Sequence, residues 1–321
     1  GFYYKTFMWP PSGWKTYEYF IRKMSGLGKA AKIHQDTNRY EHIHFHVDVL
    51  IVGGGITGLV SCLLLSTSNL KIMIADENAE LGGSLNYEDD IRINSNSGKN
   101  WARKNIKKLE NMKNVTVLKR SNVFGYHDHN YITISENCNN KSSNNITQRM
   151  WKVRAKKVIL AQGMVERPIV FSGNDLPGVM LSASVRGYAN KYGVLLGKNI
   201  VICTNNDDAY RTVLILHKAG VSIKCVADLR EKTTNEIIKK VQSLGVQILF
   251  GHSVSHVSGP GYVKNVEVSA LTSEGRTLPK TTRKIRADLI AMSGGWTPTV
   301  NLFSQSGGKL EWDNVLACFR P

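Results

Sequence analysis

The residues that most directly indicate chemistry are Gly53, Gly55 and Gly58, which are spaced as G-x-G-x-x-G. They follow an apolar run without a helical period, residues 47–52, and precede a leucine-rich segment. Between a strand and a helix, the first glycine permits a tight turn and the second leaves room for a pyrophosphate. The third allows the helix to pack closely on the strand, and the free N–H groups at the helix start face the phosphates. We call residues 53–58 the glycine turn.

An acidic residue and a second glycine pair extend this pattern. The next apolar run, residues 71–75, ends in Asp76, whose carboxylate would accept hydrogen bonds from ribose hydroxyls. The same carboxylate would repel a ribose phosphate, so NAD or FAD is favoured over NADP. No catalytic residue and no metal ligand is predicted on this chain. The predicted cofactor contacts are Gly53, Gly54, Gly55, Ile56, Thr57, Gly58, Asp76, Glu77, Gly82, Gly83, Ser84, Ala161, Gly163, Gly294 and Gly295.

Composition limits the function classes. The chain has 321 residues, enough for two domains, and no apolar run approaches the roughly 18 residues that span a bilayer. Its formal charge of +17 could indicate nucleic acid, but the densest lysine group, residues 99–113, has the pattern of an amphipathic helix. We therefore expect neither nucleic-acid nor membrane binding. Five scattered cysteines without C-x-x-C predict a reducing, cytoplasmic setting.

The elements that must position these residues follow from periodicity. Residues 1–46 read as an aromatic arm with a helix from about residue 14 to 24. Residues 47–177 plus 284–321 are predicted to form an α/β, Rossmann-like dinucleotide-binding domain with a parallel sheet. Strands are expected at residues 115–118, 121–126, 131–135 and 151–161, with a polar hairpin loop at 137–145. We expect the strand at residues 286–293 to return to this first sheet, bringing Gly294 and Gly295 near the cofactor.

Residues 178–283 repeat the opening unit as a second, smaller Rossmann-like domain that interrupts the first. A strand at residues 198–203, a helix at 209–219 and a strand at 221–227 ending at Asp228 form its strand–helix–strand unit. The connection between strand and helix, residues 204–209, contains no glycine and carries Asp207 and Asp208. Side chains would fill the space of a pyrophosphate and two carboxylates would repel it. We call residues 204–209 the acidic turn and predict that it binds no dinucleotide.

Two histidine groups offer other chemistry. His42, His44 and His46 alternate along an extended segment, but no cysteine or carboxylate group is visible to complete a zinc tetrahedron. A polar strand face explains them better. The sequence His127-Asp128-His129 lies on a predicted hairpin instead of at a strand's carboxyl end, so a structural role is favoured over acid–base catalysis.

Longer strings resemble a known family. The two strand–helix–strand units and a strand ending Ala161-Gln162-Gly163 are similar to the flavoprotein reductases with two dinucleotide-binding domains, in which the strand usually ends Ala-Thr-Gly. Residues 1–10 (GFYYKTFMWP), 124–130 (FGYHDHN), 173–180 (GNDLPGVM), 204–211 (TNNDDAYR) and 293–298 (SGGWTP) resemble the α subunits of heterotetrameric sarcosine oxidases over the whole chain.

This resemblance implies a cofactor and partners. Family members are about three times longer, so we expect this chain to be the central part of a longer polypeptide. They oxidise sarcosine to glycine, produce hydrogen peroxide and pass the one-carbon unit to tetrahydrofolate. A β-type flavoprotein subunit carries the FAD that oxidises the amine, FMN lies near its contact with the α subunit, and smaller subunits complete the heterotetramer. The α subunit holds NAD, here at Gly53, Gly55, Gly58 and Asp76.

Two alternatives remain open at this point. The chain could bind FAD at the glycine turn as a subunit of a related opine or proline dehydrogenase or oxidase. It could also be a non-catalytic scaffold subunit whose aromatic arm and positive surface dock an acidic partner.

Overall fold

The computed structural model of the chain describes residues 9–26, 36, 38–138 and 146–321. The chain divides into two units, residues 1–39 and 40–321. The first unit contains η1 (Pro11–Gly13) and α2 (Trp14–Met24), which confirms the predicted helix. The predictions for the first eight residues of the aromatic arm, and for most of the loop at 137–145, lie outside the described residues.

The first sheet of the larger unit combines parallel and antiparallel pairing. Its strand order is β5-β2-β1-β8-β7-β6, with β1, β2 and β5 parallel and β6, β7 and β8 antiparallel. Strands rich in β-branched residues were predicted at most of these positions and are confirmed. The bounds are β1 (Arg39–Val52), β2 (Ile72–Ala75), β5 (Val115–Leu118), β6 (Ser121–His127), β7 (Tyr131–Asn137) and β8 (Ile146–Leu160).

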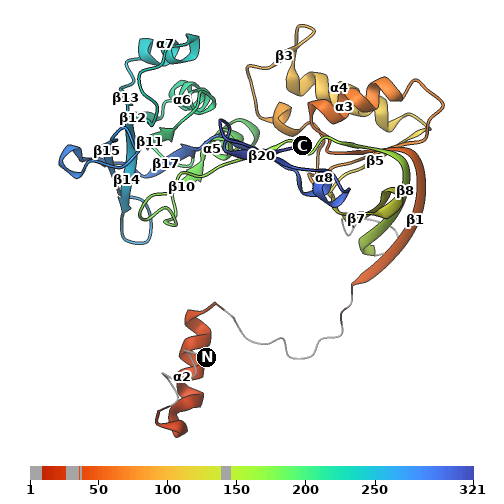
Figure 1. Ribbon diagram of the computed structural model, residues 1–321, viewed down its shortest axis with the longest axis horizontal. Coiled ribbons are helices and arrows are strands. Elements are labelled where there is room, and N and C mark those ends of the chain that lie inside the picture. Colours follow the sequence, from red (N-terminus) through yellow and green to blue (C-terminus); the bar gives the residue numbers. More distant parts are fainter. Residues whose placement is uncertain (1–8, 27–35, 37, 139–145) are drawn as a thin grey trace. The chain divides into compact units, whose positions relative to one another are not determined.

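Both faces of this sheet are covered. Along β1 the buried side chains alternate, so that Ile51 packs with the helices α3 (Ile56–Leu65) and α4 (Gly98–Glu110) while Leu50 packs on the other side with Trp151 of β8. Figure 1 shows α3 and α4 together beside the first sheet. Short elements complete the region, namely η2 (Gly83–Asn86), β3 (Arg92–Ile93), β4 (Asn96–Ser97) and η3 (Asp128–Asn130).

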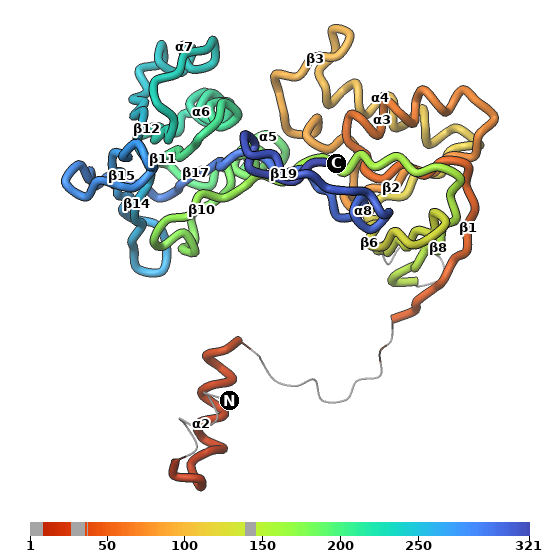
Figure 2. The backbone as a smooth tube through the Cα atoms, viewed as in Figure 1, coloured from red at the N-terminus to blue at the C-terminus, as the bar shows by residue number. Residues whose placement is uncertain are grey.

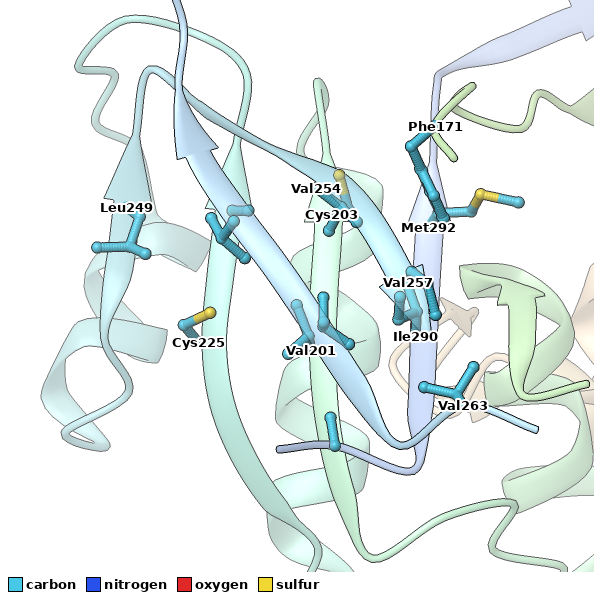
Figure 3. Packing of buried hydrophobic residues seen from close by; sticks show 14 residues of the cluster. Phe171, Val201, Cys203, Cys225, Leu249, Val254, Val257, Val263, Ile290 and Met292 are labelled. Carbon is cyan, nitrogen blue, oxygen red and sulfur yellow. The ribbon is translucent and has the colours of Figure 1, made fainter. Parts of the chain in front are cut away.

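The second sheet is fully parallel, with strand order β10-β17-β11-β12-β13. One face is covered by three helices and the other by the antiparallel sheet β14-β15-β16. Figure 3 shows the apolar side chains between the two sheets, including Val201, Val254 and Ile290. The strands are β10 (Val179–Leu181), β11 (Asn199–Thr204), β12 (Ser222–Asp228), β13 (Ile248–Phe250), β14 (His252–Ser258), β15 (Asn265–Ala270), β16 (Arg283–Arg286) and β17 (Leu289–Ser293); the helices are α5 (Ser182–Tyr192), α6 (Asp208–Lys218), α7 (Glu236–Ser243) and η4 (Pro279–Thr281).

One strand prediction is wrong. The strand expected to return to the first sheet is β17, and it lies between β10 and β11 in the second sheet. All five of its residues are buried, as is typical of a central parallel strand that is covered on both faces. A continuous apolar run fits a central position in either sheet, so the sequence pattern does not reveal which sheet the strand joins.

The two sheets are joined by a short antiparallel pair. The chain leaves the first sheet through β9 (Met164–Glu166) and returns through β18 (Trp296–Pro298), and these two strands pair with each other. Figure 2 lets the reader follow both passages along the tube. Beyond them lie α8 (Asn301–Gln305) and the hairpin of β19 (Glu311–Asp313) and β20 (Cys318–Arg320). Within the described parts of the chain, no helix has the length and apolar character needed to cross a membrane.

Candidate dinucleotide site

The glycine turn has the backbone that its sequence predicts. Gly53 adopts a φ of +101°, and a Cβ there would overlap the carbonyl oxygen of Ala161. A Cβ on Gly58 would overlap the carbonyl oxygen of Gly53. Any larger residue at either position would therefore push α3 away from β1 or break the turn.

The space around Gly55 is open, in contrast to the crowded surroundings of Gly53 and Gly58. It precedes the first residue of α3, and no heavy atom lies within 4 Å of where its Cβ would be. No side chain caps this helix start, so the first N–H groups of α3 stay available for an anion. The open space at Gly55 is the cradle that a pyrophosphate requires.

Asp76 holds the turn in place from the end of β2. Its carboxylate is buried, and Oδ2 accepts a hydrogen bond of 2.6 Å from the backbone N–H of Gly54. Oδ1 accepts bonds from the backbone and side chain of Asn78, at 2.8 and 3.0 Å. Asp76 thus fixes the loop geometry and also lies in the wall of the adjoining cleft.

A cleft of about 1090 Å³ opens at the carboxyl ends of β1 and β2. It is slightly larger than the roughly 300–1,000 Å³ typical of small-molecule sites, which suits an extended ligand. Ten of the predicted contacts line it together: Gly53, Gly55, Ile56, Thr57, Asp76, Glu77, Gly83, Ser84, Ala161 and Gly163.

The other five predicted contacts lie outside the cleft lining. Gly54 and Gly58 lie behind the cradle, and Gly82 donates its N–H to the carbonyl of Gly54 at 2.7 Å, so these three shape the turn. Gly294 donates to the carbonyl of Arg167 at 2.7 Å, and a Cβ on Gly295 would meet the Arg167 guanidinium. Gly294 and Gly295 are thus not among the residues that line the cleft, and their contact with a cofactor stays a prediction.

Sequence reasoning missed several residues of the cleft. One end carries apolar side chains, and another part carries four charged groups that are discussed below. The sequence pattern could have identified Trp296 as a cleft residue, because it directly follows a glycine pair after a buried strand. The additional lining residues include Asn78, Tyr87, Glu88, Ser121, Asn122, Gln162, Met164, Val165, Arg186, Asp208, Arg211, Trp296, Pro298, Thr299, Val300 and Phe303.

Gln162 gives a test of whether the cleft fits a polar ligand. Its Nε2 donates to Asn301 Oδ1 at 3.2 Å, while its Oε1 is buried and has no partner among the described residues. A buried unpaired acceptor in a cleft wall is costly unless a ligand or water satisfies it. With the empty space at Gly55 and the free N–H groups of α3, the residues present fit a bound dinucleotide.

The acidic turn is surrounded by side chains that contact one another. Asp228, at the end of β12, is fully buried and accepts a hydrogen bond of 2.7 Å from the hydroxyl of Tyr210. Arg230 donates from Nη2 to Asp228 Oδ2 and from Nη1 to Asp207 Oδ1, both at 2.8 Å. Burial and the Asp228 carboxylate raise the pKa of Tyr210 above its ordinary value, which keeps it a donor. At the position that corresponds to Gly55, the turn carries Asp207, whose carboxylate pairs with Arg230.

The histidine groups occupy structural positions. His42, His44 and His46 are exposed on alternate positions of β1, as expected for a polar strand face. His127 stacks beside Tyr131 across the β6–β7 hairpin, with ring centroids 5.6 Å apart. Among the described residues, no group of three or more His, Cys, Asp or Glu is arranged to hold a metal.

The chain contains one mixed and one fully parallel sheet, each with a Rossmann-like strand–helix–strand unit, and the glycine turn lies in the first of them. This arrangement is typical of the class of nucleotide-dependent oxidoreductases. Residues 47–318 match the family Pyridine nucleotide-disulphide oxidoreductase, and the chain belongs to this family. Its five cysteines are buried and form no disulfide, and burial raises the pKa of Cys62 to about 11.

Curated relatives confirm the more specific resemblance. The chain is 35% identical to the sarcosine oxidase subunit alpha of Rhizobium meliloti (strain 1021), over 99% of this chain and 31% of that protein. It is 36% identical to the sarcosine oxidase subunit alpha of Corynebacterium sp. (strain U-96), over 93% of this chain and 31% of that protein. The chain therefore spans about a third of the length of these relatives.

A solved structure supports the fold. L-proline dehydrogenase from P. horikoshii matches with a TM-score of 0.62 and 19% identity, over 91% of this chain and 49% of that one. At that identity the match shows a shared architecture alone.

Proposed function

We propose that this chain is the NAD-binding part of an α-type subunit of a sarcosine oxidase. The observation that carries the proposal is the 35% identity to a sarcosine oxidase α subunit across 99% of the chain, joined to an open glycine cradle in the same residues. The whole enzyme would oxidise sarcosine to glycine, form hydrogen peroxide and transfer the one-carbon unit to tetrahydrofolate.

The charge at the ribose end of the cleft supports a non-phosphorylated nucleotide. Asp76 and Glu77 both line the cleft after β2, and a phosphate on the ribose would face two carboxylates. The N–H groups at the start of α3 would hold the pyrophosphate, and the apolar side chains of Trp296 and Phe303 would shield a planar ring from water. A nicotinamide ring supplies hydride acceptance when bound.

Apart from Asp76 and Glu77 at the ribose end and the ion-paired Asp208, the described lining of the cleft offers no base for amine oxidation. None of its described lining residues is a histidine, lysine or cysteine. Tyr87 lies in it, but burial raises the pKa of its hydroxyl, so it stays protonated at neutral pH. Glu88 is held in ion pairs with two arginines. We therefore assign the chemistry on sarcosine to a β-type flavoprotein partner.

The test is reconstitution of the enzyme from its subunits. The complete α-type polypeptide with its β-type partner and smaller subunits should produce hydrogen peroxide from sarcosine, and the α-type polypeptide alone should produce none. Sarcosine oxidation by a preparation that lacks the β-type subunit would contradict the assignment. Oxidation of an opine or of proline in preference to sarcosine by the full complex would favour the alternative substrate class.

A further inference from the structure

The acidic turn contributes to a buried ion-pair network that the predicted function does not use. Arg186 on α5 is almost completely buried, and its Nη2 lies 2.8 Å from Glu88 Oε1 and 2.8 Å from Asp208 Oδ2. Burial would lower the pKa of Arg186, but Asp208 and Glu88 raise it above its ordinary value. The guanidinium therefore stays charged, and losing either carboxylate would leave a buried charge under-compensated.

A second arginine closes the network. Arg211 on α6 lies 3.0 Å from Glu88 Oε2 and 3.5 Å from Asp208 Oδ1, and it also contacts Asp90. Two cations and three carboxylates thus meet at one place. The Arg186–Glu88 pair at its centre depends most on geometry, because these two side chains are buried and have lost the water that would otherwise solvate them.

The network joins the acidic turn to the wall of the dinucleotide cleft. Glu88 follows η2, the segment that brings Gly83 and Ser84 to the cleft, whereas Asp208 belongs to the acidic turn and is the first residue of α6. Asn190 of α5 adds a hydrogen bond of 2.7 Å to the carbonyl of Tyr87. Four members of this network line the same cleft: Glu88, Arg186, Asp208 and Arg211.

We propose that Asp208, acting through Arg186 and Arg211, is a positioning residue that fixes residues 83–88 as one wall of the dinucleotide site. The ligand in this proposal rests on the proposed function, because it is the NAD of the cleft. The acidic turn then serves the first sheet's cofactor instead of holding one of its own. Fixing this wall before binding removes an ordering penalty that would otherwise weaken affinity.

The chain offers a matched control in the neighbouring residue. Asp207 has the same charge and belongs to the same turn, but its carboxylate pairs with Arg230 and does not line the cleft. Asp207→Asn and Asp208→Asn therefore remove one charge each from adjacent positions, and only the second removes a charge that pairs with Arg186.

The experiment combines hydrogen exchange with NAD titration of the nucleotide-free purified protein. We expect Asp208→Asn to speed amide exchange in residues 83–90 and to raise the Kd for NAD about tenfold, with Asp207→Asn changing neither. Asp208→Glu should restore most of the affinity. A residue that only stabilised the fold would lower the unfolding midpoint without changing the Kd of the folded protein. If Asp208→Asn does not fold, Arg211→Gln serves as the replacement variant. We expect Arg211→Gln to raise the Kd for NAD severalfold.

Unchanged NAD affinity and unchanged exchange in the Asp208→Asn protein would overturn the positioning role, as would equal effects of Asp207→Asn. Failure of the proposed function looks different, because the unmodified protein would then bind no NAD. In that case faster exchange of residues 83–90 in Asp208→Asn still supports the fixed wall, and unchanged exchange rejects it.

Discussion

The glycine turn and the acidic turn occupy equivalent places in the two larger sheets. Each joins a buried strand to a helix, and in each case the next strand ends at an aspartate, Asp76 or Asp228. The third helical residue is Gly58 in one and Tyr210 in the other. The glycine leaves α3 close to β1, whereas the tyrosine hydroxyl reaches Asp228 at 2.7 Å.

The difference shows that architecture alone does not make a cofactor site. Gly55 faces open space, while Asp207 at the corresponding position pairs with Arg230. The N–H groups at the start of α3 have no side-chain cap, whereas side chains around the second turn pair with one another. The fold provides the location, and the residues of the turn decide whether a ligand can use it.

The largest expected effect is at Gly55. Gly55→Val should fold, because a Cβ there has no heavy atom within 4 Å, and should abolish nucleotide binding, because the side chain fills the pyrophosphate space. Nucleotide content of the purified variant is the measurement. Asp207→Val makes the corresponding change in the acidic turn and should leave the nucleotide in place. Full nucleotide occupancy in the Gly55→Val protein would contradict the assignment of the nucleotide site to the glycine turn.

The two strand-end aspartates should separate binding from stability. Asp228→Asn removes a buried carboxylate that Tyr210 and Arg230 contact, and should lower the free energy of unfolding by about 2–4 kcal/mol with NAD affinity nearly unchanged. Asp76→Asn should instead weaken NAD binding about tenfold. Urea denaturation and NAD titration of both variants measure the contrast, and a reversed pattern would contradict it.

Adding glycines to the acidic turn should not convert it into a nucleotide-binding site. In Asn205→Gly/Asp207→Gly, Tyr210 and Arg230 still occupy the space beside Asp228, so we expect one nucleotide per chain, as in the unmodified protein. Nucleotide stoichiometry after denaturation is the measurement. A second bound nucleotide would mean that glycine content alone distinguishes the turns.

The smallest effect concerns Glu166, in the pair of strands that joins the two sheets. Burial raises the pKa of its carboxyl above the ordinary value, although Ser293 and the Ala183 N–H oppose the shift. The folded state therefore holds this proton to higher pH than the unfolded state, and stability falls as pH rises through the raised pKa.

Glu166→Gln removes that loss, since it keeps a neutral side chain at every pH. We expect the variant to be more stable than the parent by up to about 1 kcal/mol at pH 7 and to show no gain at pH 4. Thermal unfolding at both pH values measures it. An equal change at both pH values would point to packing instead of ionisation.

The sequence predicted the features that neighbouring residues determine, and it did not predict those that depend on contacts between distant residues. The glycine turn, α4 and the strands β5 to β7 were predicted because neighbouring residues determine them. The sheet that β17 joins was not, because a strand buried on both faces carries no mark of its neighbours. The Arg186–Glu88 pair spans 98 positions in sequence, so nothing local could reveal that part of the cleft wall.

The most direct test of the central claim is to denature the purified protein and identify the nucleotide released. An open glycine cradle, an acidic ribose end and a filled second turn predict one NAD per chain, and none from Gly55→Val. Release of FAD would assign the cleft to a flavin, and release of no nucleotide from the unmodified protein would contradict the site itself.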